Sequence, residues 1–110
     1  MKSPFTGWID GLPQVDTPFT GLEGRMISGP DGQAVFFHAE DRVEVQPHAH
    51  GAQWGIVVTG TLHLTISGEA GTYGPGETYD IPDGAEHSAV LEAGCAVIDC
   101  FAEAGRYNAK

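Results

Sequence analysis

Basic residues are scarce in this sequence. Five lysines and arginines stand against fifteen aspartates and glutamates over 110 residues, which gives a formal net charge of −10 at pH 7. Proteins that bind nucleic acids neutralise phosphates with continuous basic surfaces, and a negative charge also repels anionic lipid headgroups. The five basic residues are too few and too scattered for such a surface: Lys2, Arg25, Arg42, Arg106 and Lys110. We therefore expect neither a nucleic acid nor a membrane as a partner.

Long hydrophobic runs and cysteines are also scarce. No apolar run approaches the roughly 20 residues of a membrane-spanning helix, and the first residues, MKSPFTGWIDG, lack the apolar core of a signal peptide. Cys95 and Cys100 are five residues apart in one predicted strand, so we expect them on opposite faces and without a disulfide. No neighbouring base indicates a nucleophilic thiol. Two free thiols fit a reducing compartment, and we expect a cytoplasmic location.

Glycine, by contrast, is abundant, with 16 residues, about twice its usual share of roughly 7 %. Turn residues recur at short intervals from residue 21 onward, and runs rich in β-branched and aromatic residues lie between them. The predicted strands span residues 25–27, 34–38, 43–45, 54–58, 62–66, 78–81, 87–91 and 96–101. Evenly spaced short strands predict an all-β sandwich or barrel, and a chain of 110 residues indicates one domain.

Residues 1–20 differ in character from residues 21–110, which we expect to form the barrel. Pro4, Pro13 and Pro18 argue against regular structure in this N-terminal arm, yet its apolar side chains, such as Phe5 and Trp8, are unsuited to a solvated tail. The arm therefore covers a surface. It packs either over its own barrel or over an edge strand of a second subunit, and the sequence leaves both alternatives open.

Three histidines have a spacing that indicates a metal site. His48 and His50 are two residues apart in PHAHGAQWGIVVTG, so both imidazoles point to the same face of an extended chain. Such a pair can hold one metal ion at about 2.0–2.1 Å from each nitrogen. Gln53 follows three residues after His50, and His87 lies just beyond a Pro-Asp-Gly turn, three residues after Gly84, that directs its ring. The sequence thus predicts a site that contains these histidines.

Both segments resemble the two sequence motifs of the cupin superfamily. His48, His50 and Gln53, followed by Gly60, resemble the first motif, and Gly76, five residues, Pro82, Gly84 and His87 resemble the second, with fifteen residues between Gly60 and Gly76. The similarity covers residues 43–91 and is that of a small single-domain bacterial cupin. It implies a double-stranded β-helix, or jelly-roll barrel, that is commonly a homodimer. It also implies one divalent ion (Zn, Ni, Mn or Fe) held by His48, His50, Gln53 and His87.

The sequence departs from the first motif at the fourth ligand. Gln53 stands where the family has glutamate, and the loop after His50 is one residue shorter than usual. In the second motif, Leu91 replaces an asparagine that is not generally a ligand. With three neutral imidazoles and one amide, the charge of a divalent ion stays uncompensated, which favours Lewis-acid chemistry over iron redox cycling. Similar three-histidine, one-glutamine sets occur in cupins that convert sugar acids in pectin breakdown, and some bacterial lyases also belong to the superfamily.

These features leave three hypotheses for the function. The first is a metal-dependent isomerase, lyase or epimerase that acts on a small carboxylate- or hydroxyl-bearing metabolite. The second is a metal-dependent oxygenase, and the third is a cupin that binds or senses a metabolite without chemistry. Tyr79 and Asp99 are candidates for an acid and a base, although the patterns favour a packed tyrosine and a solvent-facing aspartate.

Other polar and aromatic residues have simpler interpretations. We expect His38 to be a solvent-facing strand end and favour a surface position for His63. Trp54 lies on the strand face opposite Gln53, and we expect it either in the core or in a dimer interface. Arg25 and Arg42 are taken as the cations able to bind a substrate carboxylate, although Arg42 is expected to pair with Glu40 or Glu44.

Overall fold

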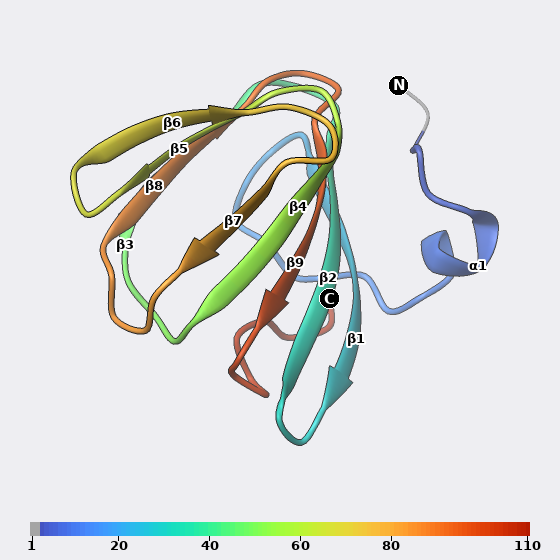
Figure 1. The fold of residues 1–110 in the computed structure, drawn as a ribbon. Helices are drawn as coiled ribbons and strands as arrows, with labels where there is room; N and C mark the ends of the chain where they lie inside the picture. The colour runs from blue at the N-terminus through green and yellow to red at the C-terminus, as the bar shows by residue number, and fades with distance from the viewer. Residues whose placement is uncertain (1–2) are drawn as a thin grey trace.

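The computed structural model describes residues 3–110, and its chain is almost entirely β-structure (Figure 1). The strands are β1 (Leu22–Gly29), β2 (Gly32–Ala39), β3 (Val43–His48), β4 (Gln53–Thr59), β5 (Leu62–Ile66), β6 (Glu69–Tyr73), β7 (Thr78–Ile81), β8 (His87–Leu91) and β9 (Ala96–Phe101). One helical turn, α1 (Gly7–Asp10), precedes them. Within residues 3–110, no helix has the length and apolar character needed to cross a membrane.

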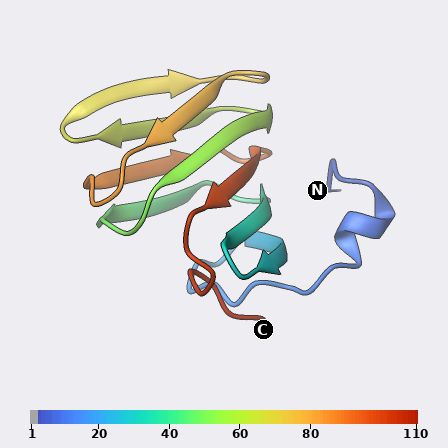
Figure 2. The same cartoon turned by 60° about the horizontal axis from the view of Figure 1, so that its bottom comes forward.

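The strands form two antiparallel sheets that face each other, with the four-stranded sheet on the left in Figure 2. The five-stranded sheet has the order β1-β2-β9-β4-β7, and the four-stranded sheet has the order β3-β8-β5-β6. The consecutive strands β3 and β4 belong to different sheets and pair with β8 and β9, which come much later in the chain. This topology is the jelly-roll arrangement that the resemblance to cupins implied.

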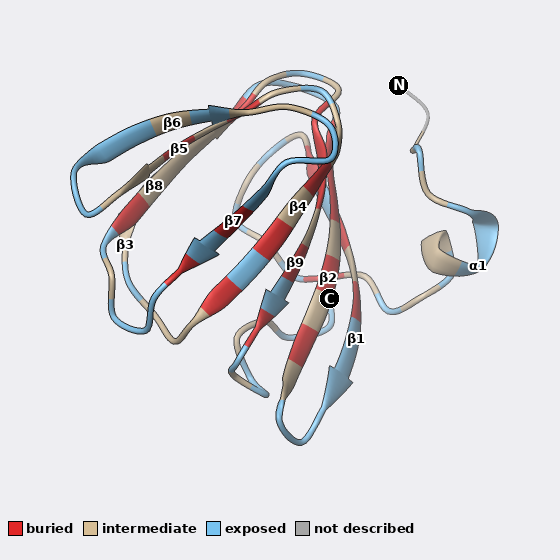
Figure 3. Ribbon diagram, viewed as in Figure 1, coloured by how far each residue is buried: buried red, intermediate tan, exposed pale blue. Residues whose placement is uncertain are grey.

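The hydrophobic core lies between the inner faces of the two sheets, because side chains alternate inward and outward along each strand (Figure 3). On β9, Val97, Asp99 and Phe101 are buried, whereas Cys100 is exposed. Cys95, just before this strand, is buried, and both cysteines are free. The expected placement of the two thiols on opposite sides of the chain is confirmed.

All eight predicted strands are present, and several are longer than expected. The sequence did not predict β6, because glutamate, alanine and glycine at its start have little β-propensity. A tight turn at Ser67 and Gly68, with φ angles of 49° and 84°, connects β5 to β6. The turn and the pairing with β5, which continues through Glu69–Tyr73, are what make this segment a strand.

The N-terminal arm packs over its own barrel in its second half. Val15 is 1 % exposed, donates its N–H to the Gly24 carbonyl at 2.8 Å, and pairs with Ala109 of the C-terminal tail. The first half contains α1, which contradicts the expected lack of regular structure between the prolines. No residue of α1 is buried, and Trp8 is 65 % exposed. The Phe5 ring, before α1, also packs edge-on against Phe36 of β2 with ring centroids 5.5 Å apart, so the arm contacts the barrel on both sides of the projecting α1 (Figure 1).

His38 is not the solvent-facing strand end that the sequence suggested. It is 4 % exposed, because β2 continues to Ala39 and lies between β1 and β9. His38 pairs with Glu23 on one side and with Ala96 on the other. A residue next to a predicted turn is thus enclosed by two neighbouring strands that the local sequence does not reveal.

Candidate metal centre

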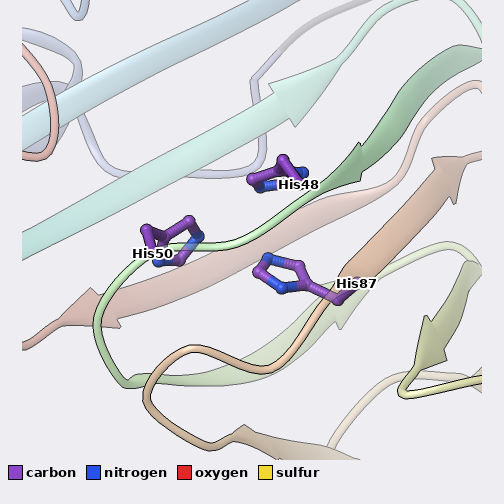
Figure 4. Close-up of side chains that lie close together, drawn as sticks. All are labelled: His48, His50 and His87. Atoms are coloured by element: carbon purple, nitrogen blue, oxygen red, sulfur yellow. The ribbon is translucent and has the colours of Figure 1, made fainter.

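The three histidines of the two motifs converge at one end of the barrel (Figure 4). His48 is the last residue of β3, His50 lies in the loop before β4, and His87 is the first residue of β8. His48 and His87 are direct partners in the antiparallel β3–β8 pair, which places their ring centroids 4.2 Å apart. The His50 ring lies 4.8 Å from that of His87 and 5.2 Å from that of His48. The predicted cluster is therefore present.

Two backbone features, the turn before His87 and a hydrogen bond between the two motifs, bring these rings close together. The turn before His87 is closed by the Ala85 N–H, which donates to the Pro82 carbonyl at 3.0 Å. Gly84 adopts a φ of +76° in this turn, a conformation that side chains other than glycine rarely take. The Gly84 N–H also donates to the His50 carbonyl at 2.9 Å, so the two motifs are tied together directly.

Each of the three imidazoles is oriented by a hydrogen bond from Nδ1 to a backbone carbonyl. A carbonyl oxygen only accepts, so in the neutral form of each ring Nδ1 carries the proton and Nε2 keeps its lone pair. One potential ligand atom from each ring lies within 4.8 Å of the others. The three contacts are His48 to Gln46 at 2.9 Å, His50 to Gly51 at 2.8 Å and His87 to Ala85 at 3.0 Å.

This donor set fits a divalent transition-metal ion. The Nε2 atom of His50 is buried and has no hydrogen-bond partner, which is costly unless a ligand satisfies it. Burial lowers the pKa of both His50 and His87, which keeps these rings in the neutral form that binds metals. The cluster His48, His50 and His87 can thus hold one metal ion of the kind that prefers imidazole nitrogen, such as zinc, nickel or iron.

Gln53 lies on the wall of the same cavity, as the first residue of β4, and is 9 % exposed. Its side chain hydrogen-bonds to the carboxylate of Asp99, and this contact lowers the pKa of Asp99. An amide that donates its N–H₂ group to a carboxylate keeps its oxygen free to accept or to ligate. Ligation by Gln53 stays a prediction, and the arrangement leaves the required oxygen available for it.

Asp99 is not solvent-facing, which corrects the interpretation favoured from the sequence. It lies on the inner face of β9 and is 6 % exposed. Burial raises its pKa to about 6, against the opposing effect of hydrogen bonds from Tyr79 and Gln53. The Tyr79 hydroxyl donates to Asp99 Oδ1 at 2.5 Å, and burial raises the pKa of Tyr79. Tyr79 is packed, as expected, and it also holds a buried carboxyl group.

Gly55 makes the approach of Tyr79 and Asp99 possible. It lies on β4 between the two strands that carry them and pairs with both residues across the sheet. A β-carbon at Gly55 would overlap the phenol of Tyr79 and the carboxylate of Asp99. A glycine inside a strand often marks such a close approach of neighbouring groups. This signal was present in the sequence but did not identify the partners.

Arg106 is a functional candidate that the sequence reasoning missed. It follows β9 in the C-terminal tail and lines the cavity that contains the histidines. Its Nε is buried without a hydrogen-bond partner, and its guanidinium lies 4.5 Å from the centre of the Tyr107 ring. Its charge contributes to lowering the pKa of His50 and of His87, although less than burial does.

A buried glutamine explains why the tail brings Arg106 to this place. Gln33 on β2 donates its amide to the Tyr107 carbonyl at 2.8 Å and accepts the Tyr107 N–H at 2.9 Å. This pair of bonds fixes the backbone next to Arg106. Because Gln33 and Tyr107 are far apart in the sequence, no local pattern indicated the contact.

The two arginines that the sequence favoured have other partners. Arg42 pairs with Glu44 at 2.6 Å, as expected, and with Glu92 at 3.4 Å. Arg25 donates to the carbonyl of Leu12 at 3.2 Å. Neither arginine lines the cavity, so the interpretation that they are the carboxylate-binding cations is wrong for this fold.

His63 and Trp54 both lie outside the cavity. The favoured surface position of His63 is confirmed, and its ring contacts Glu92 at 2.9 Å. Trp54 is 44 % exposed and lies on the face opposite Gln53.

The cavity has a volume of about 390 Å³ and lies between the two sheets. Most of its walls are apolar, with Phe37, Leu64 and Ile81 as examples. Its polar lining residues are the three histidines, Gln46, Gln53, Tyr79, Asp99, Arg106 and Tyr107. An apolar cavity with a few convergent polar groups is the usual form of a small-molecule site.

Known structures with the same fold include several small cupins. KdgF from Halomonas sp. is 30 % identical, with a TM-score of 0.71 over 79 % of this chain and 83 % of that chain. An RmlC-like cupin from Shewanella frigidimarina is 24 % identical, with a TM-score of 0.78 over 96 % and 95 %. A cupin-2 domain protein from the same organism is 26 % identical, with a TM-score of 0.62 over 73 % and 79 %. No protein-family model and no curated protein matches the sequence.

A two-sheet jelly roll with a histidine cluster at one end defines a small β-barrel protein whose histidines can hold a metal ion. Together with these similarities, it shows that the chain is a member of the cupin superfamily.

Proposed function

We propose that this cupin is a metal-dependent isomerase, lyase or epimerase that acts on a small metabolite with a carboxylate group. His48, His50 and His87 would hold one divalent ion, and the Gln53 oxygen would complete the set. The bound ion supplies a Lewis acid that stabilises negative charge as it develops on a substrate oxygen. The remaining steps belong to residues of the chain itself.

The buried, unpaired Nε of Arg106 is the observation that supports a carboxylate substrate. A partly buried guanidinium whose Nε has no partner is unfavourable in the free protein, and a carboxylate can pair with it through two parallel hydrogen bonds. The group lies in the same cavity as the histidines, so one small molecule can contact both. The cavity of about 390 Å³ fits a metabolite of the size of a sugar acid.

Asp99 is the residue that we assign as the base. Isomerisation, elimination and epimerisation next to a carboxylate all begin with the removal of a proton from carbon. The Asp99 carboxylate lies in the cavity and can accept that proton, and it can return the proton to carbon or to a leaving oxygen. The Tyr79 hydroxyl stays protonated because burial raises its pKa, and it keeps the carboxylate in place.

Two alternatives remain, a binding or sensing cupin and a metal-dependent oxygenase. A binder needs the histidines and Arg106 but has no use for a buried Asp99–Tyr79 pair, which favours the enzyme. An oxygenase needs an ion that changes its oxidation state, and the neutral ligand set opposes the trivalent form. The three functions predict different outcomes: exchange or conversion of an acid, binding of an acid without reaction, or consumption of dioxygen.

Deuterium exchange distinguishes the enzyme from a binder. Zinc-loaded protein would be incubated in D₂O with small uronic, hydroxy and keto acids, and the substrate C–H signals followed by NMR. We expect one carbon-bound proton to exchange or one acid to convert, with Asp99→Asn at least about 100-fold slower. Acids that bind but never exchange or react would favour the sensing alternative. Consumption of dioxygen by iron-loaded protein would favour the oxygenase.

We also propose that two copies associate through the outer face of the five-stranded sheet. Phe36, Ile98 and Ile56 are partners across β2, β9 and β4 and form one apolar row. Trp54 and Ile27 lie in the neighbouring row and are 44 % and 47 % exposed. Phe36 is half-buried and contacts Phe5 of the N-terminal arm, with ring centroids 5.5 Å apart, whereas Trp54 and Ile27 are exposed beside it. Exposed large apolar side chains that extend such an apolar row are typical of an interface.

A further inference from the structure

The loop that joins His50 to Gln53 has only two residues, Gly51 and Ala52, so its conformation sets the position of both site residues. The structure ties this loop to the chain that follows β9. The Ala102 N–H donates to the Ala52 carbonyl at 2.9 Å. The side chain of Glu103 extends back to the loop, where Oε1 accepts the Gly51 N–H at 2.5 Å.

Glu103 and Gly84 hold the two ends of the same peptide group. The peptide between His50 and Gly51 has its N–H bound to the Glu103 carboxylate and its carbonyl bound to the Gly84 N–H. A peptide unit is planar, so two bonds at opposite edges fix its orientation. The next carbonyl, that of Gly51, accepts the Nδ1 proton of His50 and directs the ring.

The absence of a side chain at residue 51 admits the glutamate. A β-carbon at Gly51 would lie 2.8 Å from Cγ and 2.9 Å from Oε1 of Glu103. Oε1 also lies 3.6 Å from Nδ1 of His50, so the carboxylate is adjacent to the ring. Gly51 and Glu103 therefore fit each other, although 52 positions separate them in the sequence.

We infer that Glu103 is a positioning residue of the metal centre: by binding the Gly51 N–H, it holds the shortened loop so that His50 and Gln53 face the ion. This inference rests on the metal centre of the proposed function. Residues that orient metal ligands from outside the coordination shell typically change metal affinity by 10–100-fold when they are replaced. The role needs an acceptor oxygen at this place, which glutamine also provides.

The test compares Glu103→Ala with Glu103→Gln in the full chain. Zinc affinity would be measured by competition calorimetry, and the exchange of the Gly51 amide proton by NMR on metal-free protein. We expect Glu103→Ala to bind zinc about tenfold more weakly and to exchange the Gly51 proton faster. Glu103→Gln should stay within about twofold of the parent, because its amide oxygen accepts the same bond.

Glu77→Ala is the matched control. Glu77 Oε1 accepts the Gly74 N–H at 2.8 Å, a contact of the same type in the loop between β6 and β7, and neither residue lines the cavity. The zinc affinity of Glu77→Ala should equal that of the parent. This result would separate the role of Glu103 from a general loss of loop order.

Three results would overturn the inference. The first is an unchanged Gly51 exchange rate in Glu103→Ala, and the second is faster exchange with unchanged zinc affinity. The third is a parent protein that binds no zinc, which would remove the metal centre and the proposed function together. Zinc binding that depends on Glu103, in a protein that converts no acid, would overturn only the proposed enzyme.

Discussion

The hydroxyl of Tyr79 donates a 2.5 Å hydrogen bond to Oδ1 of Asp99 inside the cavity that the three histidines line. Tyr79 comes from β7 and Asp99 from β9, and β4 lies between these strands in the sheet. Gly55 on β4 leaves the space through which they meet. The buried Tyr79–Asp99 pair and the histidine cluster that could hold a metal ion therefore line the same cavity.

The raised pKa of Asp99 predicts a pH-dependent stability difference in Asp99→Asn. The pKa rises from an ordinary 3.8 to about 6 on folding, mainly through burial. Because the folded state binds more protons between these values, this group stabilises the protein below about pH 4, and the contribution is lost as the pH rises through 6. At pH 8 the ionised, buried carboxylate of Asp99 lowers the free energy of unfolding by at most about 3 kcal/mol.

We therefore expect metal-free Asp99→Asn to gain stability relative to the parent as the pH rises from 4 to 8. The difference in the free energy of unfolding between variant and parent should grow by 1–3 kcal/mol, on the order of the pKa shift. Urea unfolding at the two pH values measures it, and comparison with the parent cancels the other titrating groups. A difference that is the same at both pH values would contradict the buried, raised pKa.

Gly55→Ala should separate the Tyr79–Asp99 pair. The added β-carbon overlaps both side chains, so we expect a loss of about 1–3 kcal/mol in the free energy of unfolding. Catalytic exchange should fall while zinc stays bound, because the histidines are on other segments. Gly29→Ala is the control, since its nearest neighbour would be the Gly32 carbonyl oxygen at 4.0 Å. Equal stability of the two variants in urea unfolding would argue against the close approach.

Gln53→Glu tests the electrostatic consequence of the amide. A carboxylate next to the ion would cancel one unit of positive charge and bind the metal more strongly, at a cost in Lewis acidity. We expect zinc to bind at least as tightly as in the parent, whereas a small sugar acid binds more weakly. Calorimetric titration with zinc and then with the acid measures both affinities. Unchanged values for both would mean that Gln53 only orders the loop and its contact with Asp99.

Trp54→Lys tests the proposed association of two copies. A charge in the middle of the apolar outer face should convert a dimer into a monomer, because an unpaired charge is unfavourable in an interface. Sedimentation velocity gives the mass of both proteins. Trp8→Lys is the control, since Trp8 is even more exposed but lies on α1, outside the strands that form this face. A parent that sediments as a monomer at high concentration would refute the proposal.

The fold and the histidine cluster were predictable because their signals are local. Short runs between turn residues indicate strands wherever they pair, and the spacing of His48 and His50 places both rings on one face of an extended segment. The turn before His87 likewise depends on neighbouring residues. Among the strands of residues 3–110, only β6 was missed, because its strand character comes from pairing with β5 rather than from its own residues.

The inward position of Asp99 and the presence of Arg106 in the cavity were not predictable, because both depend on contacts between distant segments. Alternation along β9 grouped Asp99 with Val97, but the face that turns inward is set by the opposing sheet. Arg106 reaches the cavity because Gln33 holds Tyr107, 74 residues away in the sequence. Glu103 likewise binds Gly51, in the loop between His50 and Gln53, across 52 positions of the sequence.

The metal content of the protein tests the central claim most directly. Protein purified without a metal-affinity tag should contain about one first-row divalent ion per chain by elemental analysis, and that ion should raise the melting temperature. The double variant His48→Ala, His87→Ala should contain almost none while keeping the β-rich circular dichroism spectrum of the parent. A folded double variant that retains full metal occupancy would contradict the assignment of the centre to these histidines.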